Sequence, residues 1–94
     1  MSAGPIHLKV LTHEGVVIED DAVSIRAPGG LGSLGILRNH APLLTTLVPG
    51  PFMWRQANGT SQTVRVGSGI LEIAHNQCTV LTSEMTPPTS GPTR

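Results

Sequence analysis

The sequence has 94 residues, no net charge when histidine is neutral, 13% charged residues and 2% aromatic residues. This length predicts a single domain. The balanced charge offers no attraction for nucleic acid or an anionic membrane, and so few aromatic side chains provide no stacking platform for bases. One cysteine, Cys78, excludes an internal disulfide framework. No apolar run reaches the ~18 residues that span a bilayer. We therefore expect any membrane association to go through a partner, without direct insertion.

The first quarter of the chain alternates between short strand patterns and turn signals. Apolar and polar residues alternate over 6–10 and 23–27, and an apolar run occupies 16–18, so we expect three strands there. His13-Glu14-Gly15 is a turn signal between the first two. Glu19-Asp20-Asp21 places three like charges together, and we expect these residues to form a solvated turn.

The stretch from Ala27 to Gly50 is rich in glycine and bounded by Pro-Gly pairs. It predicts a wide loop, a very short strand over 34–37, a polar corner at Arg38-Asn39-His40 and a longer strand that ends at Val48. The glycines at 30, 32 and 35 match a dinucleotide fingerprint in spacing, but that fingerprint requires a helix to start at the last glycine. No helical pattern follows immediately, so we reject a dinucleotide-binding site here.

The pattern over 42–48 fits a helix or a strand equally well.

The second half of the chain predicts two more strand pairs. Residues 52–57 and 61–66 flank Asn58-Gly59, the strongest hairpin signal in the sequence. Residues 70–73 and 77–82 form another pair. Short strands separated by turns indicate an all-β fold, an antiparallel β-sandwich or flattened barrel of about ten strands. We expect this domain to occupy residues 1–84, with residues 85–94 as a flexible, disordered proline-rich tail.

The residue pattern identifies no reactive centre. His75 and Cys78 are separated by two residues, but no second pair has zinc-ligand spacing. Cys78 alternates with Val80, which predicts a small core residue. Ser33 and Ser68 lack the Gly-x-Ser-x-Gly motif of a nucleophile elbow. We assign no catalytic, metal-binding or cofactor-binding residue.

Residues 35–44 resemble the Gly-Ile-x-x-x-His-Ala-Pro-Leu-Leu core of the epsilon subunit of F-type ATP synthases. Further segments resemble the same family in the same order, so that the resemblance covers about Ile6 to Glu84. These segments are Ile6–Thr12, Pro49-Gly50, Gly67–Ile73 and Thr79–Thr82. The resemblance implies the β-sandwich domain of that subunit, and it favours a strand over 42–48.

The resemblance also implies a function. Such a subunit belongs to the central stalk and couples the gamma subunit to the c-ring, for ion-driven ATP synthesis or ATP-driven ion pumping. It is not an enzyme itself, and it lies peripherally on the cytoplasmic face of the inner membrane as part of the F1 complex. The family's C-terminal inhibitory helices are expected to be absent, and no cofactor or small-molecule ligand is expected. The alternatives are a stand-alone small β-barrel that binds a ligand and, as an enzyme, a small hydrolase.

The family's ring-contacting segments map onto two short stretches here. They imply that the residues facing the c-ring are Leu31, Gly32, Ser33, Leu34, Arg38, Asn39 and His40. We expect both stretches to project from one end of the sandwich. For His40 a structural role, with its ring bonded to neighbouring backbone, is the favoured interpretation. Structural roles are also expected for Gly35, Pro42, Gly50 and Gly69.

The loop departs from the family pattern in charge. Two acidic positions of the family are occupied by Leu31 and Ser33, and the usual Pro-Gly before the histidine is replaced by Arg38-Asn39. Relative to the family pattern, the segment implied to contact the ring has therefore lost negative charge and gained one positive charge. We hypothesise that the polar loop of the partner ring differs in a compensating way, with fewer basic groups or an added acid.

Overall fold

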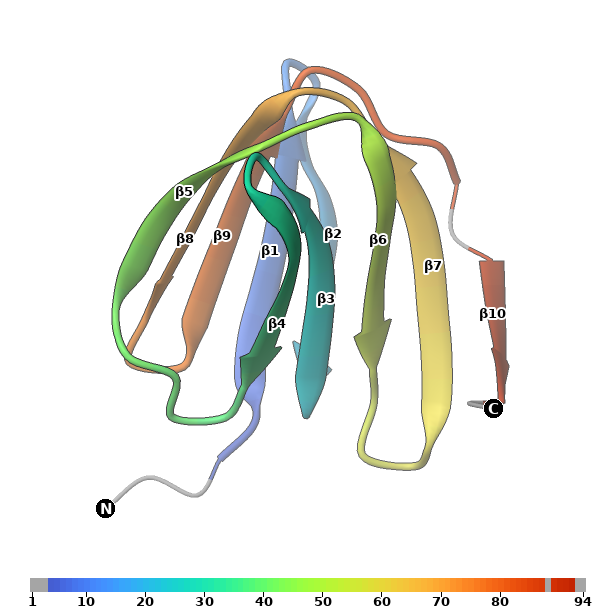
Figure 1. The fold of residues 1–94 in the computed structure, drawn as a ribbon. Coiled ribbons are helices and arrows are strands. Elements are labelled where there is room, and N and C mark those ends of the chain that lie inside the picture. The colour runs from blue at the N-terminus through green and yellow to red at the C-terminus, as the bar shows by residue number, and fades with distance from the viewer. Residues whose placement is uncertain (1–3, 88, 93–94) are drawn as a thin grey trace.

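A computed structural model describes residues 4–87 and 89–92, and this part of the chain consists of strands, turns and loops without a helix (Figure 1). The strands are β1 (Ile6–Thr12), β2 (Gly15–Ala22), β3 (Ser24–Gly29), β4 (Gly32–Leu37), β5 (Leu43–Leu47), β6 (Gly50–Arg55), β7 (Thr60–Val66), β8 (Gly69–Ala74), β9 (Gln77–Thr82) and β10 (Thr89–Pro92). The predicted all-β fold is confirmed.

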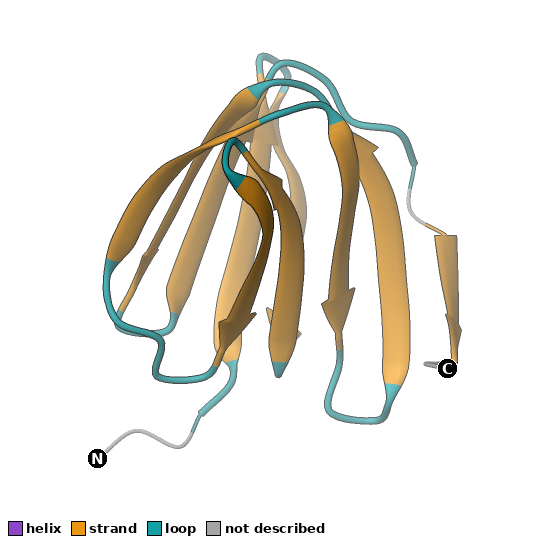
Figure 2. Cartoon of the chain, viewed as in Figure 1, coloured by secondary structure: helices purple, strands orange, loops and turns teal. Residues whose placement is uncertain are grey.

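The strands form one sheet that curls until its two halves face each other (Figures 1 and 2). The strand order is β10-β7-β6-β3-β5-β8-β9-β1-β2, and β4 pairs with β3 beside this path. We call β3, β4, β6, β7 and β10 the first half, and β1, β2, β5, β8 and β9 the second half. Strand β1 runs parallel to β9, whereas the other named pairs are antiparallel.

The core lies between the two halves because every second residue of most strands is apolar and points inward. In β1 the inward residues Ile6, Leu8 and Val10 are fully buried. From the opposite half, Phe52 and Trp54 enter the same core with their ring centroids 6.1 Å apart in a tilted arrangement. Each large apolar side chain buried in this way contributes about 1.5–3 kcal/mol to folding.

The strand pairs predicted in the second half of the sequence are confirmed. Strands β6 and β7 pair around residues 56–59, and Gly59 has a φ of +90°. Strands β8 and β9 are joined by His75 and Asn76, which have φ values of 51° and 58°. Two consecutive positive values are typical of the tight hairpin turn whose twist matches the strands. Strand β5 confirms the strand interpretation of residues 42–48, from Leu43 to Leu47.

The predicted solvated turn at Glu19-Asp20-Asp21 is wrong, because these residues belong to β2. Glu19 lies opposite Lys9 on β1, and Asp21 lies opposite His7. Alternation places Glu19 and Asp21 on the outer surface and turns Asp20 toward the interior edge of the sheet. Each of the three carboxylates has a hydrogen-bonding partner, and these partners make the carboxylates compatible with a strand.

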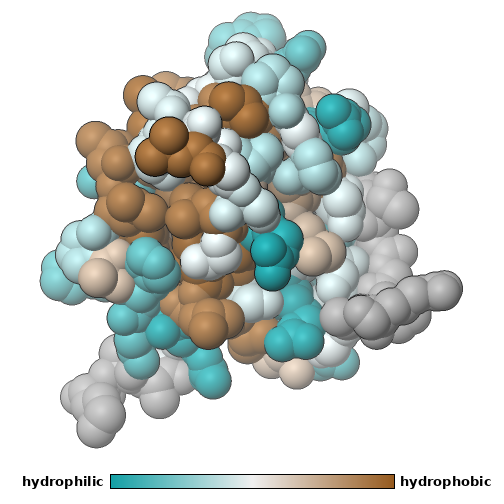
Figure 3. Space-filling model, in the orientation of Figure 1, coloured by the Kyte–Doolittle hydropathy of each residue, from teal (hydrophilic) through white to brown (hydrophobic). Residues whose placement is uncertain are grey.

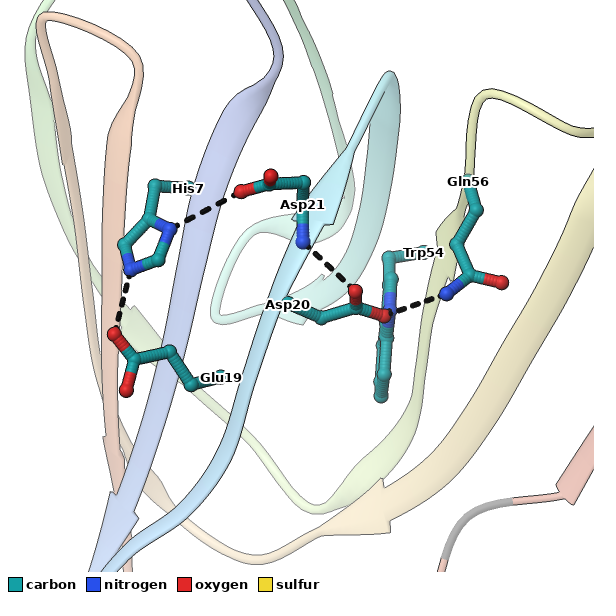
Figure 4. A network of polar contacts seen from close by, with 6 residues as sticks. All are labelled: His7, Glu19, Asp20, Asp21, Trp54 and Gln56. Atoms are coloured by element: carbon teal, nitrogen blue, oxygen red, sulfur yellow. Dashed lines mark hydrogen bonds and ion pairs between the residues drawn. The ribbon is translucent and has the colours of Figure 1, made fainter.

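Asp20 joins the edge strand β2 to β6 (Figure 4). One oxygen of its carboxylate accepts hydrogen bonds from Trp54 Nε1 at 2.8 Å and from Gln56 Nε2 at 2.9 Å. Nearby, the amide of Val23 donates to the carbonyl of Arg55 at 2.8 Å. The buried indole N–H is thereby satisfied, and the end of the sheet is attached to the facing half. We call this contact the Asp20 clasp.

The glycine-rich segment is a tight hairpin and not the predicted wide loop. Gly29 lies opposite Gly32, so only Gly30 and Leu31 form the turn between β3 and β4. A Cβ atom at Gly30 would lie 2.8 Å from Thr46 Oγ1, because the turn packs against β5. The close approach of the Thr46 hydroxyl, and not a broad loop, therefore explains glycine at position 30.

The structure describes one short strand within the predicted tail, and the expected flexibility of residues 85–94 stays a prediction. Thr89–Pro92 forms β10 and pairs antiparallel with Thr60–Thr63 at the edge of β7. The open edge of β7 offers unpaired backbone groups, and a short strand satisfies them even without an apolar sequence pattern. Residues 88, 93 and 94 of the predicted tail lie outside the described residues.

Replacing Asp20 tests the clasp. We expect Asp20→Ala to lower the free energy of unfolding by about 1–3 kcal/mol, because the Trp54 N–H stays buried without its acceptor. Urea denaturation followed by tryptophan fluorescence measures the change. Asp21→Ala is the matched control, since that carboxylate is largely exposed; both variants are measured at about pH 8.5, where the ion pair of Asp21 with His7 contributes least. Equal stability of the two variants would contradict the proposed role of the clasp.

Candidate interaction surface

An apolar row crosses the outer surface of the second half of the sheet. Leu11 lies opposite Val16 on β2 and opposite Leu81 on β9, and Leu81 lies opposite Ile70 on β8. Val16, Leu81 and Ile70 are 51%, 53% and 48% exposed, and Leu11 is half-buried. Because neighbouring strands lie about 4.8 Å apart, these four side chains form a continuous band about 14 Å long. We call Val16, Leu11, Leu81 and Ile70 the apolar row.

A second group of exposed apolar residues lies around β4 and β5. Leu37 at the end of β4 and Leu44 in β5 are 65% and 69% exposed. Leu31 at the β3–β4 turn is fully exposed, and Val48 follows β5. Figure 3 shows hydrophobic residues gathered on this side of the molecule. Contiguous apolar surface of this kind is typical of protein contacts.

The two segments expected to contact the ring do not lie at one end of the domain. The Gly30-Leu31 turn precedes β4, whereas Arg38-Asn39-His40 follows it, so the segments occupy opposite ends of that strand (Figure 1). A strand of this length spans about 20 Å. The expectation that both project together is therefore wrong. A partner that touches both segments must lie along β4.

The polar corner after β4 is held by the turn between β8 and β9. The amide of Asn39 donates to Asn76 Oδ1 at 2.6 Å, and Asn76 Nδ2 donates to Asn39 Oδ1 at 3.1 Å. Asn39 has a φ of 64°, a left-handed conformation that asparagine tolerates better than most residues. His40 Nδ1 lies 2.7 Å from the carbonyl oxygen of Ala41, which orients the ring. The corner is thus a fixed feature of the surface.

The four residues expected to be structural differ in their surroundings. A Cβ atom at Gly69 would overlap the carbonyl oxygen of Leu81, and one at Gly50 would lie 3.0 Å from Pro28 Cβ. At Gly35 an added Cβ atom would meet no atom within 4 Å. Steric contacts therefore require glycine at position 69 and leave little room for a side chain at position 50. They give no reason for glycine at position 35. Pro42 is exposed and precedes β5 at the corner.

His7 forms two ion pairs on the outer surface (Figure 4). Its Nδ1 lies 3.1 Å from Asp21 Oδ1, and its Nε2 lies 2.7 Å from Glu19 Oε2. The hydrogen bonds to Asp21 and then to Glu19 raise the pKa of His7 above its ordinary value of 6.5. Both bonds favour the protonated ring, because each nitrogen then donates to a carboxylate.

Reactive groups are sparse in the part of the chain that the structure describes. Cys78 is buried in the core, as predicted, and burial raises the pKa of its thiol to about 12. This makes it a poor nucleophile at neutral pH. Within residues 4–87 and 89–92, no three His, Cys, Asp or Glu side chains are grouped to hold a metal ion. The same residues contain no helix long and apolar enough to cross a membrane.

The family model of the β-sandwich domain of ATP synthase delta/epsilon chains matches residues 5–88. The chain belongs to this family. The match covers all the strands from β1 to β9, so the apolar row and the corner at Asn39 both lie within the family domain.

Curated relatives agree with this assignment. The ATP synthase epsilon chain of Desulfosudis oleivorans is 38% identical over 76 residues, which are 81% of this chain and 57% of the relative. The epsilon chain of Desulfitobacterium hafniense is 34% identical over 85 residues, which are 90% of this chain and 64% of the relative. The epsilon chain of Chloroflexus aurantiacus is 40% identical over 77 residues, which are 82% of this chain and 55% of the relative. The chain thus spans between half and two thirds of the length of these epsilon chains.

Two solved structures contain similar folds. A chain in the Euglena gracilis mitochondrial ATP synthase, in a structure of OSCP, F1 and c-ring, matches with a TM-score of 0.86 and 17% identity. The match covers 93% of this chain and 56% of that one. A chain in the central stalk and c-ring of the Tetrahymena thermophila mitochondrial enzyme matches with a TM-score of 0.72 and 20% identity, over 92% and 69% of the two chains. At these identities the likeness concerns the fold of this delta/epsilon-type domain.

Several surface features of this delta/epsilon-type domain were missed from sequence. The apolar row combines residues from four strands, and the parallel pairing of β1 with β9 was not predicted. The partnership of Asn39 with Asn76 spans 37 positions. The alternation of Leu81 with buried Val80 was a usable signal, because it marks Leu81 as an apolar residue on the outer surface.

The ion pairs of His7 predict a pH dependence. A raised pKa means that the folded state favours the proton, so the stabilisation is present below pH 6.5 and is lost as pH rises through the folded pKa. We therefore expect His7→Gln to be most destabilising at about pH 5.5 and least at about pH 8.5. Urea unfolding at both pH values measures this. A pKa of His7 below 6.5 in an NMR titration would contradict the ion pairs.

Proposed function

We propose that this chain is an epsilon-type, non-catalytic subunit of the central stalk of an F-type ATP synthase. In this role it connects the gamma subunit to the c-ring, so that torque passes between ion flow and ATP synthesis or hydrolysis. It is a peripheral part of the F1 complex on the cytoplasmic face of the inner membrane. Membership of the delta/epsilon family supports this proposal, as do relatives named epsilon chain.

The apolar row is the surface that we assign to the gamma subunit. It is the observation that carries the proposal, because a coupling subunit needs a broad contact that does not slip under load. Four apolar side chains in adjacent strands provide such a contact on a rigid sheet. The sheet beneath them is attached to the opposite half by the Asp20 clasp. Apolar burial at this row would supply the affinity.

The surface along β4 is the one that we assign to the c-ring. Its two ends are the Leu31 turn and the His40 corner, so a ring contact involving both runs the length of the strand. Leu37 adds exposed apolar surface between them. Arg38 adds positive charge at one end of the contact, which fits an acidic group on the polar loop of the ring.

Substitutions in the apolar row test the contact with gamma. We expect Ile70→Ser and Leu81→Ser each to weaken binding to F1 depleted of this subunit by about tenfold or more, because a buried Leu or Ile contributes about 1.5–3 kcal/mol. Surface plasmon resonance measures the affinity. Leu31→Ser is the matched control, since it removes an exposed leucine that lies in the turn before β4, outside the apolar row.

The outcome separates binding from folding because both row residues are exposed and their loss leaves the core intact. Thermal melting should therefore stay close to that of the wild type for all three variants. Wild-type affinity of both row variants would refute the assignment of this surface to gamma. Failure of the unaltered chain to bind the depleted F1 would refute the proposed function itself.

A further inference from the structure

The zero net charge of the chain conceals two oppositely charged halves. Strands β3, β4, β6 and β7 carry three arginines and no acidic residue, which gives +3. Strands β1, β2, β5, β8 and β9 carry four acidic residues and one lysine, which gives −3 with histidine neutral. Such separation creates local fields that composition alone does not reveal.

The arginines of the first half share one outer surface. Arg55 lies opposite Ser61 at one end of β6, Pro51 lies opposite Arg65 at the other end, and Met53 lies between them opposite Arg26. All three arginines are exposed. Four residues of strand separate the two ends, or about 13 Å. We call Arg26, Arg55 and Arg65, together with Met53 and Pro51, the basic face.

No acidic side chain neutralises the basic face from within the described residues. The two ion pairs identified among the described residues are those of His7, which lies on the other half of the sheet. On the basic face, the side chain of Arg26 donates to the hydroxyl of Ser33 at 3.3 Å. A groove of about 400 Å³ also lies on this face, lined by Arg26 and by apolar side chains. Its apolar lining includes Pro28, Val48, Pro51 and Met53. Arginine and methionine around an apolar hollow are typical of protein interfaces.

The composition of this face argues against nucleic acid and lipid as its ligand. The two large aromatic residues, Phe52 and Trp54, point into the core and are 0% and 3% exposed, so no ring is available to stack on bases. Three cations are also fewer than the four to eight that mark a lipid-binding cluster. A protein segment with carboxylates and an apolar side chain matches both the charges and the groove.

We propose that the basic face binds an extended acidic polypeptide segment that carries an apolar residue between two carboxylates. In an extended segment, side chains at i, i+2 and i+4 point the same way, and the outer two are about 13 Å apart. This spacing matches that between the Arg55 and Arg65 positions along the sheet. The central apolar residue then lies over Met53 and the groove. This contact is separate from the apolar row and does not depend on the proposed stalk function.

A peptide titration of the full chain tests the proposal. The probe is the peptide Ser-Glu-Ser-Leu-Ser-Glu-Ser, followed by ¹H–¹⁵N chemical-shift changes up to millimolar concentration. We expect saturable shifts at residues of β6 and β7, a loss of affinity of about tenfold for the double variant Arg55→Glu/Arg65→Glu, and weaker binding in high salt. Lys9→Glu is the matched control, because it makes the same type of charge change on the other half.

Each alternative outcome is decisive. Absence of saturable shifts would overturn the proposal, and so would equal affinity of the wild type and the double variant. Equal binding of Ser-Lys-Ser-Leu-Ser-Lys-Ser would show that charge plays no part and would also overturn it. Co-sedimentation with phosphatidylserine vesicles without peptide binding would assign the face to lipid and refute a protein segment. The unaltered affinity of the Lys9→Glu variant for the acidic peptide would support the proposal.

Discussion

Burial of one shared core between the two halves of a single curled sheet is the constraint on which the surface of this domain depends. The inward side chains of each strand are buried in that core. Only the outward side chains and the turns are therefore available to bind partners. Strand register then decides which outward residues become neighbours. The register shift between Val10 and Leu11 shows the consequence, because it places Val16 opposite Leu11 and leaves Val17 packed against the core. One extra residue in β2 thus completes the apolar row.

Short-range signals predicted the strands and hairpins, whereas contacts between distant segments escaped prediction. Asn58-Gly59 marks its hairpin locally, and alternation marks β1 and β9. The place of Glu19-Asp20-Asp21 in a strand depends on Trp54, which lies 34 positions from Asp20. The corner at Asn39 likewise depends on Asn76, a residue with no recognisable signal in the sequence. Charge separation was invisible because composition adds opposite charges from both halves to zero.

Rigidity connects these contacts to the proposed role in the stalk. The Asp20 clasp attaches the last strand of the second half to the first half, and the paired asparagines fix the corner after β4. A coupling piece needs such cross-links, because a surface that shifts under load transmits little torque. The same rigid body presents three surfaces of different chemistry: the apolar row, the length of β4 and the basic face. The apolar row and the basic face lie on different halves of the sheet, so two partners can bind there without competing for one patch.

Cross-saturation NMR on the assembled complex tests most directly whether the apolar row is the surface that holds this domain to the stalk. The chain carries protonated methyl groups in a deuterated background and is bound to protonated gamma-containing F1. The account predicts the strongest saturation transfer at the methyl groups of Ile70, Leu81, Leu11 and Val16. Transfer confined to Met53 on the basic face and to Val48 in its groove, with the methyl groups of the apolar row unaffected, would contradict this assignment.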